Sequence, residues 1–247
     1  MSGVVYLVGA GPGAPDLMTL RGARLLGEAD TVLHDALIHP DVLALATRAR
    51  LYNVGKRAGR PSVDQRFICR LMVRLALCGR TVVRLKGGDP HLFGRAAEEI
   101  EACRAAGLSV VTVPGVSAGF AAAAALGASL TSRGVSRSVA FVTPSSARGA
   151  NPNAHWARAA AAAETAVLYM GAAHAELVRD TLVGLGVRPT QPVALIESAS
   201  WAEEKVIRGV LDDLPALASG LGEGPAIIVM GEAAAHAQSA LDAANAA

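Results

Sequence analysis

The sequence predicts an α/β fold with two α/β domains, the first containing a mostly parallel sheet and the second a mixed sheet. Across residues 1–130, short apolar runs alternate with longer segments of helical periodicity. This β-α-β-α order is typical of parallel sheets. Later in the chain, apolar runs follow one another across short links, which favours partly antiparallel pairing. We therefore predict an N-terminal domain at residues 1–130 and a C-terminal domain at residues 131–247.

In the N-terminal domain, glycine-containing turns separate the predicted strands from the predicted helices. The strands are expected at residues 4–8, 31–34, 51–54, 82–85 and 109–113. Helices are expected at about 16–28 and 63–77, from 94 to the glycine at 107, and along an Ala-rich run that ends at Gly127. Pro15 suits the first turn of its helix, where a missing N–H costs nothing.

In the C-terminal domain, the expected strands lie at residues 138–143, 165–170, 192–197, 205–210 and 226–230. A helix is expected at 173–185 and a loop rich in Ser, Pro and Gly at 144–153. The Ala-rich end, residues 232–247, shows no clear apolar stripe and predicts a terminal helix or a frayed end.

Composition excludes several classes of function. The chain is 52% hydrophobic, enough for a sizeable core, and its net charge of +2 is too small for nucleic-acid binding through bulk charge. Three cysteines without CxxC spacing indicate neither a disulfide framework nor a zinc site, and favour reduced thiols in a cytoplasmic protein. We expect no signal peptide and no membrane-spanning segment, because the longest Ala-rich run is too short to cross a bilayer.

Three small-residue turns each follow a predicted strand. They are Gly9-Ala10-Gly11-Pro12-Gly13, Lys86-Gly87-Gly88-Asp89-Pro90 and Pro114-Gly115-Val116-Ser117-Ala118. Ligands of open α/β sheets bind outside the carboxyl ends of the strands, and glycine allows a close approach of the backbone to a ligand. The sequence therefore predicts a ligand site built from these turns.

The first turn is compatible with more than one function. Gly9, Gly11 and Ala14 fit the loose dinucleotide fingerprint, and Asp35 follows at the spacing of the acid that binds ribose in NAD(P)-dependent oxidoreductases. Two prolines in and beside the turn count against this interpretation, because they stiffen the loop where amides must face pyrophosphate. A non-catalytic effector-binding module is a third hypothesis.

Basic residues near these turns predict an acidic ligand. A segment at 55–60 carries Lys56, Arg57 and Arg60 between glycines, where the cations can converge on one carboxylate. Arg95 and Glu98 are three residues apart on a predicted helix and so share one face. Arg133 and Arg137 follow the predicted domain boundary, and the other interpretation for each arginine is an ordinary solvated charge.

Taken together, the motifs resemble the tetrapyrrole methyltransferase family. The resemblance rests on Val8-Gly9-Ala10-Gly11-Pro12-Gly13, Val54-Gly55-Lys56-Arg57-Ala58-Gly59, Val83-Arg84-Leu85-Lys86-Gly87-Gly88-Asp89-Pro90 with Phe93-Gly94-Arg95, Val113-Pro114-Gly115-Val116-Ser117-Ala118, and Tyr169-Met170-Gly171. It extends from about Val4 to Glu232. The motifs Lys86-Gly87-Gly88-Asp89-Pro90 and Gly55-Lys56-Arg57 favour family members that act on uroporphyrinogen III. Relatives that methylate later precorrins are the closest alternative.

The resemblance implies a homodimer of two-domain subunits with the active site in the cleft between the domains. It implies S-adenosylmethionine as methyl donor, S-adenosylhomocysteine as product and no metal. The acceptor would be uroporphyrinogen III, methylated on two pyrrole carbons to give precorrin-2 by way of precorrin-1.

The resemblance also implies roles for individual residues. Asp35 matches the position of a proton acceptor, and Lys56 matches that of a proton donor. Arg95 matches a catalytic position that also binds the substrate, and Glu98 and Arg133 match substrate-binding positions. The donor-binding positions correspond to Pro12, Gly87, Gly88, Asp89, Leu92, Ser117, Ala118, Met170, Ala199, Pro225 and Ala226. Many of these would act through backbone atoms.

Overall fold

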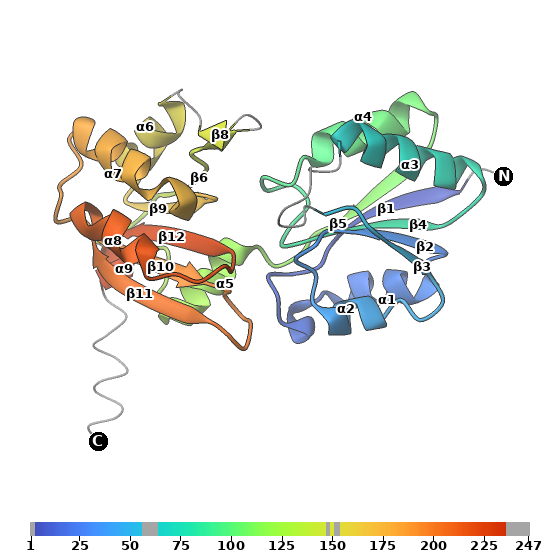
Figure 1. Cartoon of the computed structure of the whole chain (residues 1–247), viewed down its shortest axis with the longest axis horizontal. Helices are drawn as coiled ribbons and strands as arrows, with labels where there is room; N and C mark the ends of the chain where they lie inside the picture. Colours follow the sequence, from blue (N-terminus) through green and yellow to red (C-terminus); the bar gives the residue numbers. More distant parts are fainter. Residues whose placement is uncertain (1–2, 56–63, 147–148, 151–153, 236–247) are drawn as a thin grey trace, which may run out of the picture. The chain divides into compact units, whose positions relative to one another are not determined.

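The computed structural model describes residues 3–55, 64–146, 149–150 and 154–235. The chain divides into two compact units, Met1–Ser117 and Ala118–Ala247. Each unit is built on a five-stranded sheet with helices packed against it (Figure 1). Among the described residues, no helix combines the length and the apolar character needed to cross a membrane.

The first unit contains a wholly parallel sheet, which confirms the predicted parallel N-terminal sheet. Its strands are β1 (Val4–Gly9), β2 (Thr31–His34), β3 (Arg50–Asn53), β4 (Val82–Lys86) and β5 (Ser109–Val113), in the order β3-β2-β4-β1-β5. One face of the sheet carries α1 (Leu20–Glu28) and α2 (Pro40–Ala44), and the other carries α3 (Gln65–Leu77) and α4 (Ala96–Ala105) (Figure 1).

Strand β4 lies between two neighbours and is buried on both faces. Val83 and Leu85 join the apolar cluster formed with α1, and Val82 joins the cluster formed with α3 and α4. Because side chains alternate along a strand, Arg84 and Lys86 lie on the same face as Val82. Both cations therefore point toward α3 and α4, where they meet a buried carboxylate described below.

The second unit contains a mixed sheet, as predicted. Its strands are β6 (Val139–Val142), β9 (Thr165–Tyr169), β10 (Pro192–Glu197), β11 (Lys205–Val210) and β12 (Ala226–Gly231), in the order β11-β10-β12-β9-β6. Strands β6 and β9 are parallel and the other pairs are antiparallel. The two-residue strands β7 (Ser145–Ser146) and β8 (Gly149–Ala150) pair antiparallel in a separate small sheet. The helices are α5 (Ala118–Leu126), α6 (His155–Ala162), α7 (Ala175–Gly184), α8 (Leu214–Ser219) and α9 (Glu232–Ala235).

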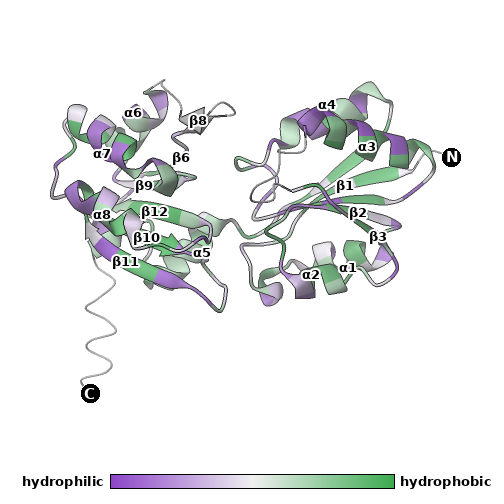
Figure 2. Cartoon of the chain, viewed as in Figure 1, coloured by the Kyte–Doolittle hydropathy of each residue, from purple (hydrophilic) through white to green (hydrophobic). Residues whose placement is uncertain are grey.

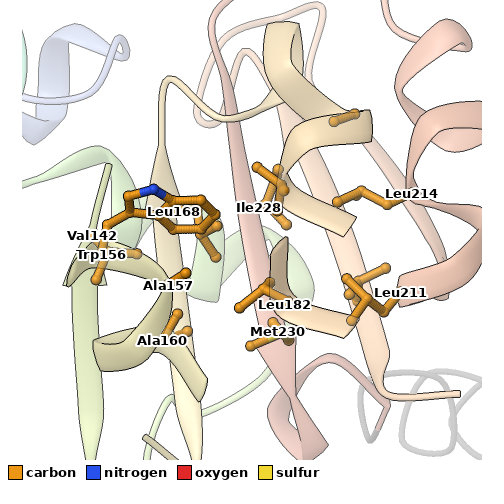
Figure 3. Close-up of a cluster of buried hydrophobic side chains, with 14 of the residues drawn as sticks. Val142, Trp156, Ala157, Ala160, Leu168, Leu182, Leu211, Leu214, Ile228 and Met230 are labelled. Carbon is orange, nitrogen blue, oxygen red and sulfur yellow. The ribbon is translucent and has the colours of Figure 1, made fainter. Parts of the chain in front are cut away.

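The core of the second unit has two layers, one on each face of its sheet. Figure 3 shows Trp156 from α6 and Leu182 from α7 packed over Leu168 and Ile228 of the sheet. Figure 2 shows that central strands such as β1 and β12 are predominantly hydrophobic. Burial of these apolar side chains is the main favourable term that holds each sheet to its helices.

Helix α5 covers the other face of the second sheet. Ala122 and Leu126 pack with Ile196 and Val229 in a single buried cluster. The expected domain boundary near Leu130 would place this helix in the first domain, whereas the two units divide between Ser117 and Ala118. The division precedes the helix because its small apolar side chains are buried against the second sheet.

Candidate functional site

The turns after β1 and β4 are joined through their backbones. Ala10 N donates to Lys86 O at 2.7 Å, which continues the pairing beyond the strand ends. Gly11 and Gly88 then exchange two hydrogen bonds, of 3.3 Å from Gly11 N and 2.7 Å from Gly88 N. Both glycines have positive φ, +80° and +65°, a conformation that glycine adopts without steric cost.

The turn after β5 packs directly against the other two. A Cβ added at Gly115 would lie 2.3 Å from Gly88 O and 2.8 Å from Gly9 Cα, and one added at Gly9 would lie 2.6 Å from Gly115 Cα. Since these neighbours are backbone atoms, no side chain could move aside to make room. Glycine at both positions is therefore required for the three turns to meet at the carboxyl edge of the sheet.

Asp89 fixes this arrangement with its carboxylate. Its Oδ1 accepts from His91 N at 2.8 Å and its Oδ2 accepts from Gly115 N at 3.0 Å. Both oxygens thus bind backbone amides, one in the turn after β4 and one in the turn after β5. Gly87 is exposed and has no atom within 4 Å of an added Cβ, so this part of the turn is open to a ligand.

The remaining predicted donor residues of the first unit lie in the same three turns. Pro12 is half-buried between Gly11 and Gly13, and Leu92 is half-buried in the segment that connects β4 to α4. Ser117 is buried at the end of the turn after β5. The structure therefore gathers the predicted donor residues of this unit at one edge of the sheet.

The second unit contains a cavity of about 440 Å³ near the ends of β9 and β12. Its lining includes the predicted residues Met170 and Ala226. The other lining residues are Ser145, Ala172, Ala173, His174, Ala218, Leu221, Gly222 and Gly224. Pro225 adjoins this lining and is exposed, while Ala118 is the first residue of α5. A volume of this size suits a small-molecule ligand.

Glu197, at the end of β10, holds one wall of this cavity. The carboxylate is 6% exposed and accepts from Gly222 N and Gly224 N, both at 2.9 Å. In the same region Ser198 N donates to Pro225 O at 2.8 Å. Ala199 follows directly and is buried. Glu197 therefore acts on the loop before β12 as Asp89 acts on the turns of the first unit.

Unusual backbone conformations mark the same positions. Among the described residues, the non-glycine residues with positive φ are Phe93, Arg95, Met170, Ser198 and Ser200. Each lies at, or next to, a position named from the sequence. Such residues cost about 1–3 kcal/mol each and cluster at ligand sites, where the surrounding structure enforces them. This pattern is an independent indication of where a ligand binds.

Asp35 follows β2 and belongs to a buried group of charges. Arg84 Nη2 lies 2.5 Å from Asp35 Oδ1, and Arg84 Nε lies 2.9 Å from Glu99 Oε1. Lys86 Nζ lies 3.1 Å from Glu99 Oε2, and Gln65 Nε2 donates to Glu99 Oε1 at 3.1 Å. The side chain of Glu99 is 0% exposed and that of Arg84 is 4% exposed, whereas that of Asp35 is 32% exposed.

The two buried cations respond differently to this environment. Burial lowers the pKa of Lys86, and the nearby charge of Arg84 lowers it further, against the opposing effect of Glu99. Burial also acts to lower the pKa of Arg84, but the charges of Asp35 and Glu99 outweigh it, and the net shift is upward. Arg84 is therefore a permanent cation between two carboxylates.

Arg95 and Glu98 form the ion pair expected from their spacing. Arg95 Nε and Nη2 donate to the two carboxylate oxygens of Glu98 at 2.7 and 2.8 Å. The hydrogen bond from Arg95 lowers the pKa of Glu98. Both side chains are about half exposed, so the pair adds little to stability. Arg133 is exposed in the second unit, and Lys56 lies outside the described residues.

Sequence reasoning missed the buried partners of these residues. Arg84, Lys86, Glu99 and Glu197 had no assigned role, although the first two stand in a strand that is otherwise Val and Leu. Two cations inside a buried strand require a buried carboxylate, because an unpaired buried charge is very costly. That signal pointed to an acidic partner, but it could not choose between Glu98 and Glu99.

The strand order contradicts the dinucleotide interpretation of the first turn. In the nucleotide-binding order, the strand that carries the glycine turn neighbours the strand that ends in the ribose-binding acid. Here β4 separates β1 from β2, so Asp35 lies two strand spacings from Gly9, about 9–10 Å. The glycine turn also enters a short 3₁₀ turn at Pro15–Leu17, and the helix starts only at Leu20.

Comparison with known proteins gives a consistent result. The family model described as Tetrapyrrole (Corrin/Porphyrin) Methylases matches residues 4–215. The chain is 45% identical over 233 residues to the uroporphyrinogen-III C-methyltransferase of Pseudomonas aeruginosa PAO1, covering 94% of each protein. It is 44% identical over 237 residues to the siroheme synthase of Tolumonas auensis, covering 95% of this chain and 50% of that protein. The chain thus spans about half the length of that siroheme synthase.

A solved structure shows the same fold. The uroporphyrin-III C-methyl transferase from Thermus thermophilus, complexed with S-adenyl homocysteine, superposes with a TM-score of 0.81 at 37% sequence identity. The match covers 94% of this chain and 93% of that chain.

Proposed function

The chain belongs to the tetrapyrrole (corrin/porphyrin) methylases, and on that premise we propose that it is a uroporphyrinogen-III C-methyltransferase. Two methyl groups pass from S-adenosylmethionine to pyrrole carbons of uroporphyrinogen III, giving precorrin-2 by way of precorrin-1. The observation that carries this proposal is the 45% identity to the Pseudomonas enzyme over 94% of both proteins.

The chemistry suits the backbone-lined site. Methyl transfer from a sulfonium to carbon is an in-line displacement, in which the enzyme aligns donor and acceptor, an effect worth up to about 7–11 kcal/mol in favourable systems. Turns that are locked together by Asp89 and by glycine contacts offer such a rigid surface. When bound, S-adenosylmethionine supplies the electrophilic methyl group, and the protein supplies position.

We assign donor binding to two groups of residues. In the first unit these are Pro12, Gly87, Gly88, Asp89, Leu92 and Ser117; in the second they are Ala118, Met170, Ala199, Pro225 and Ala226. Support comes from the open backbone at Gly87, from the cavity beside Met170 and Ala226, and from the left-handed residues that flank several of these positions.

We assign proton transfer and acceptor binding to the charged residues. Alkylating a pyrrole carbon requires the eventual loss of a proton, and we propose that Asp35 accepts it, which its partial exposure supports. Lys56 is proposed as the proton donor. Arg95, oriented by Glu98, and Arg133 are proposed to bind acceptor carboxylates, since guanidinium groups match carboxylate geometry.

The proposal is tested by incubating the purified protein with uroporphyrinogen III and isotopically labelled S-adenosylmethionine, followed by mass analysis of the pigment. We expect two labelled methyl groups per macrocycle and two equivalents of S-adenosylhomocysteine. Methylation of a later precorrin with none on uroporphyrinogen III would assign the chain to a later step. No methylation of any precorrin would leave an effector-binding module as the better hypothesis.

We further propose a cytoplasmic homodimer that needs no metal. The three cysteines are free, which supports a reducing compartment. Sedimentation analysis of the purified protein is expected to give twice the mass of the 25.1 kDa chain. Dialysis against a chelator is expected to leave methylation unchanged, and loss of activity that a divalent cation restores would contradict the absence of a metal.

A further inference from the structure

Five residues form a buried polar group behind the proposed base: Gln65, Arg84, Lys86 and Glu99 with Asp35 itself, hereafter the Arg84 cluster. We propose that Arg84 is a positioning residue that acts through Asp35, and that Glu99 fixes Arg84 in turn. This inference rests on the proposed function, in which Asp35 accepts the proton lost from the pyrrole carbon. It assigns a role to two residues whose side chains are buried, at 4% exposed for Arg84 and 0% for Glu99.

The guanidinium of Arg84 is held at all of its nitrogens. Nε donates to Glu99 Oε1 at 2.9 Å, and Nη1 donates to the carbonyl oxygens of Leu33 and Leu85 at 3.4 and 3.1 Å. Nη2 is left to donate to Asp35 Oδ1, at 2.5 Å. A planar group fixed at three corners cannot rotate, so the position of Nη2 is set by the sheet and by α4.

Glu99 is the anchor of the cluster. Its carboxylate is fully buried and lies within hydrogen-bond distance of three side chains, those of Arg84, Lys86 and Gln65. These partners come from β4 and α3, so the anchor joins both elements to α4. Lys86 supplies a second cation to Glu99. Lys86 also acts on Asp35 through its charge, but the hydrogen bond to Asp35 comes from Arg84, which links the anchor to that carboxylate.

Asp35 is the exposed end of this chain of contacts. Its side chain is 32% exposed, against 5% or less for Arg84, Lys86 and Glu99. Within the part of the chain that the structure describes, the side-chain hydrogen bond to this carboxylate comes from Arg84 Nη2 and reaches Oδ1. A buried cation thus holds a carboxylate that is itself partly exposed, an arrangement suited to a base whose orientation must be fixed.

Stability alone does not explain the cluster. A buried set of ion pairs is often no more stabilising than apolar residues of similar volume, because desolvation offsets the attraction. Valine or leucine at Arg84 and Lys86 would continue the pattern of β4 and would remove the need for a buried Glu99. A cluster that adds little stability, yet ends on the proposed base, is better explained by the orientation of that base.

A double-mutant cycle tests the inference. Arg84→Lys keeps the positive charge but cannot bind Asp35 and Glu99 through separate nitrogens of one rigid plane. We expect it to lower kcat roughly 10- to 100-fold, as misplacement by about 1 Å does, with KM and S-adenosylhomocysteine affinity within about twofold. In an Asp35→Asn background the same change should have no further effect on kcat. Equal losses in both backgrounds would overturn the inference.

Controls separate this inference from folding and from the proposed function. Arg70→Lys, at an exposed position on α3, should leave kcat unchanged. If Arg84→Lys fails to fold, Glu99→Gln is the second variant, and the same non-additivity with Asp35→Asn is expected. Absence of turnover in the wild-type protein would count against the proposed function itself. Wild-type turnover with additive losses would count against the role of Arg84 alone.

Discussion

Asp89 and Glu197 each accept hydrogen bonds from two backbone amides in loops that carry predicted donor residues. A carboxylate that binds two amides fixes the path of a loop more firmly than a neutral side chain, because hydrogen bonds to charged groups are the stronger ones. The donor binding proposed for Asp89 therefore depends first on this role. Its oxygens fix the two turns that form the proposed donor-binding surface.

Replacing Asp89 should weaken donor binding through the loops. Asp89→Ala removes the charged acceptor of an exposed hydrogen bond from His91 N and of a part-buried one from Gly115 N, and hydrogen bonds to charged groups contribute about 1.5–3 kcal/mol. We expect the affinity for S-adenosylhomocysteine, measured by isothermal titration calorimetry, to fall by about tenfold, since about 1.4 kcal/mol is a factor of ten. Asp212→Ala, at an exposed position, is the control. An unchanged affinity in Asp89→Ala would contradict this role.

The cysteines should differ in their reactivity with pH. Burial, with a smaller effect of Glu99, raises the pKa of Cys69, and burial raises the pKa of Cys103 from its ordinary value of 9.0 to about 11. Cys78 is exposed. Since the thiolate is the nucleophile, alkylation followed by mass spectrometry at pH 8 should label Cys78 first, Cys69 more slowly and Cys103 last. Equal rates of labelling of Cys78 and Cys103 in the folded protein would contradict the burial of Cys103.

The same shift has a defined effect on stability. The raised pKa means that the folded state favours the protonated thiol of Cys103. The contribution of this thiol to the free energy of unfolding is therefore intact below pH 9. Between pH 9.0 and about 11 the unfolded chain loses this proton while the folded chain keeps it, and stability falls as pH rises. Urea unfolding at pH 8 and pH 10 should show a larger drop for the wild type than for Cys103→Ala.

At the scale of secondary structure, strands were easier to predict than short helices. Most of the long strands were runs of β-branched or other apolar residues bounded by glycine or polar turns, so their limits were visible in the sequence. Helices α2, α6 and α8 have 5, 8 and 6 residues, too few turns for a helical period to show. In α6 the Ala-rich sequence also gives little contrast between the two faces.

The turns between elements give the sharpest test of element packing. Gly115→Ala places a Cβ 2.3 Å from Gly88 O, which forces the turns after β4 and β5 apart. We expect loss of S-adenosylhomocysteine binding and a lowered melting temperature, because overpacking typically costs about 1–3 kcal/mol.

A second glycine provides the matched control for this substitution. Gly184 lies at the end of α7 with no atom within 4 Å of an added Cβ. Gly184→Ala should be neutral or should stabilise by about 0.5–1 kcal/mol, the helical preference of alanine over glycine. If both substitutions had the same effect on binding, the close approach of the turns would not be what the site requires.

For the molecule as a whole, the sequence predicted both sheet types, and the expected boundary near Leu130 lies one helix after the point at which the two compact units divide. Helix α5 is apolar on all sides, so its sequence shows that it is buried without showing against which sheet. The Arg84 cluster was not foreseen for a similar reason. Its members come from β4, α3, α4 and the residue that follows β2. Periodicity predicts the face of each element but not which residues of facing elements make contact.

The separation of the cores determines how the whole protein should unfold. The buried clusters of the first unit contain residues between Val5 and Val113, and those of the second unit contain residues between Ala121 and Ala234. Each unit therefore has a hydrophobic core of its own and its own source of cooperativity. We therefore expect the calorimetric enthalpy of unfolding to exceed the van't Hoff enthalpy in the absence of ligand.

Ligand linkage then distinguishes the proposed donor from a dinucleotide in the same calorimeter. A ligand that binds only folded protein stabilises it by about 2.7 kcal/mol at a concentration of 100 times its Kd. S-adenosylhomocysteine should therefore raise at least one unfolding transition by several degrees, whereas NADPH should raise none, because β4 separates the first glycine turn from Asp35. Stabilisation by NADPH without stabilisation by S-adenosylhomocysteine would contradict the proposed function. A single two-state transition without ligand would contradict the independence of the two cores.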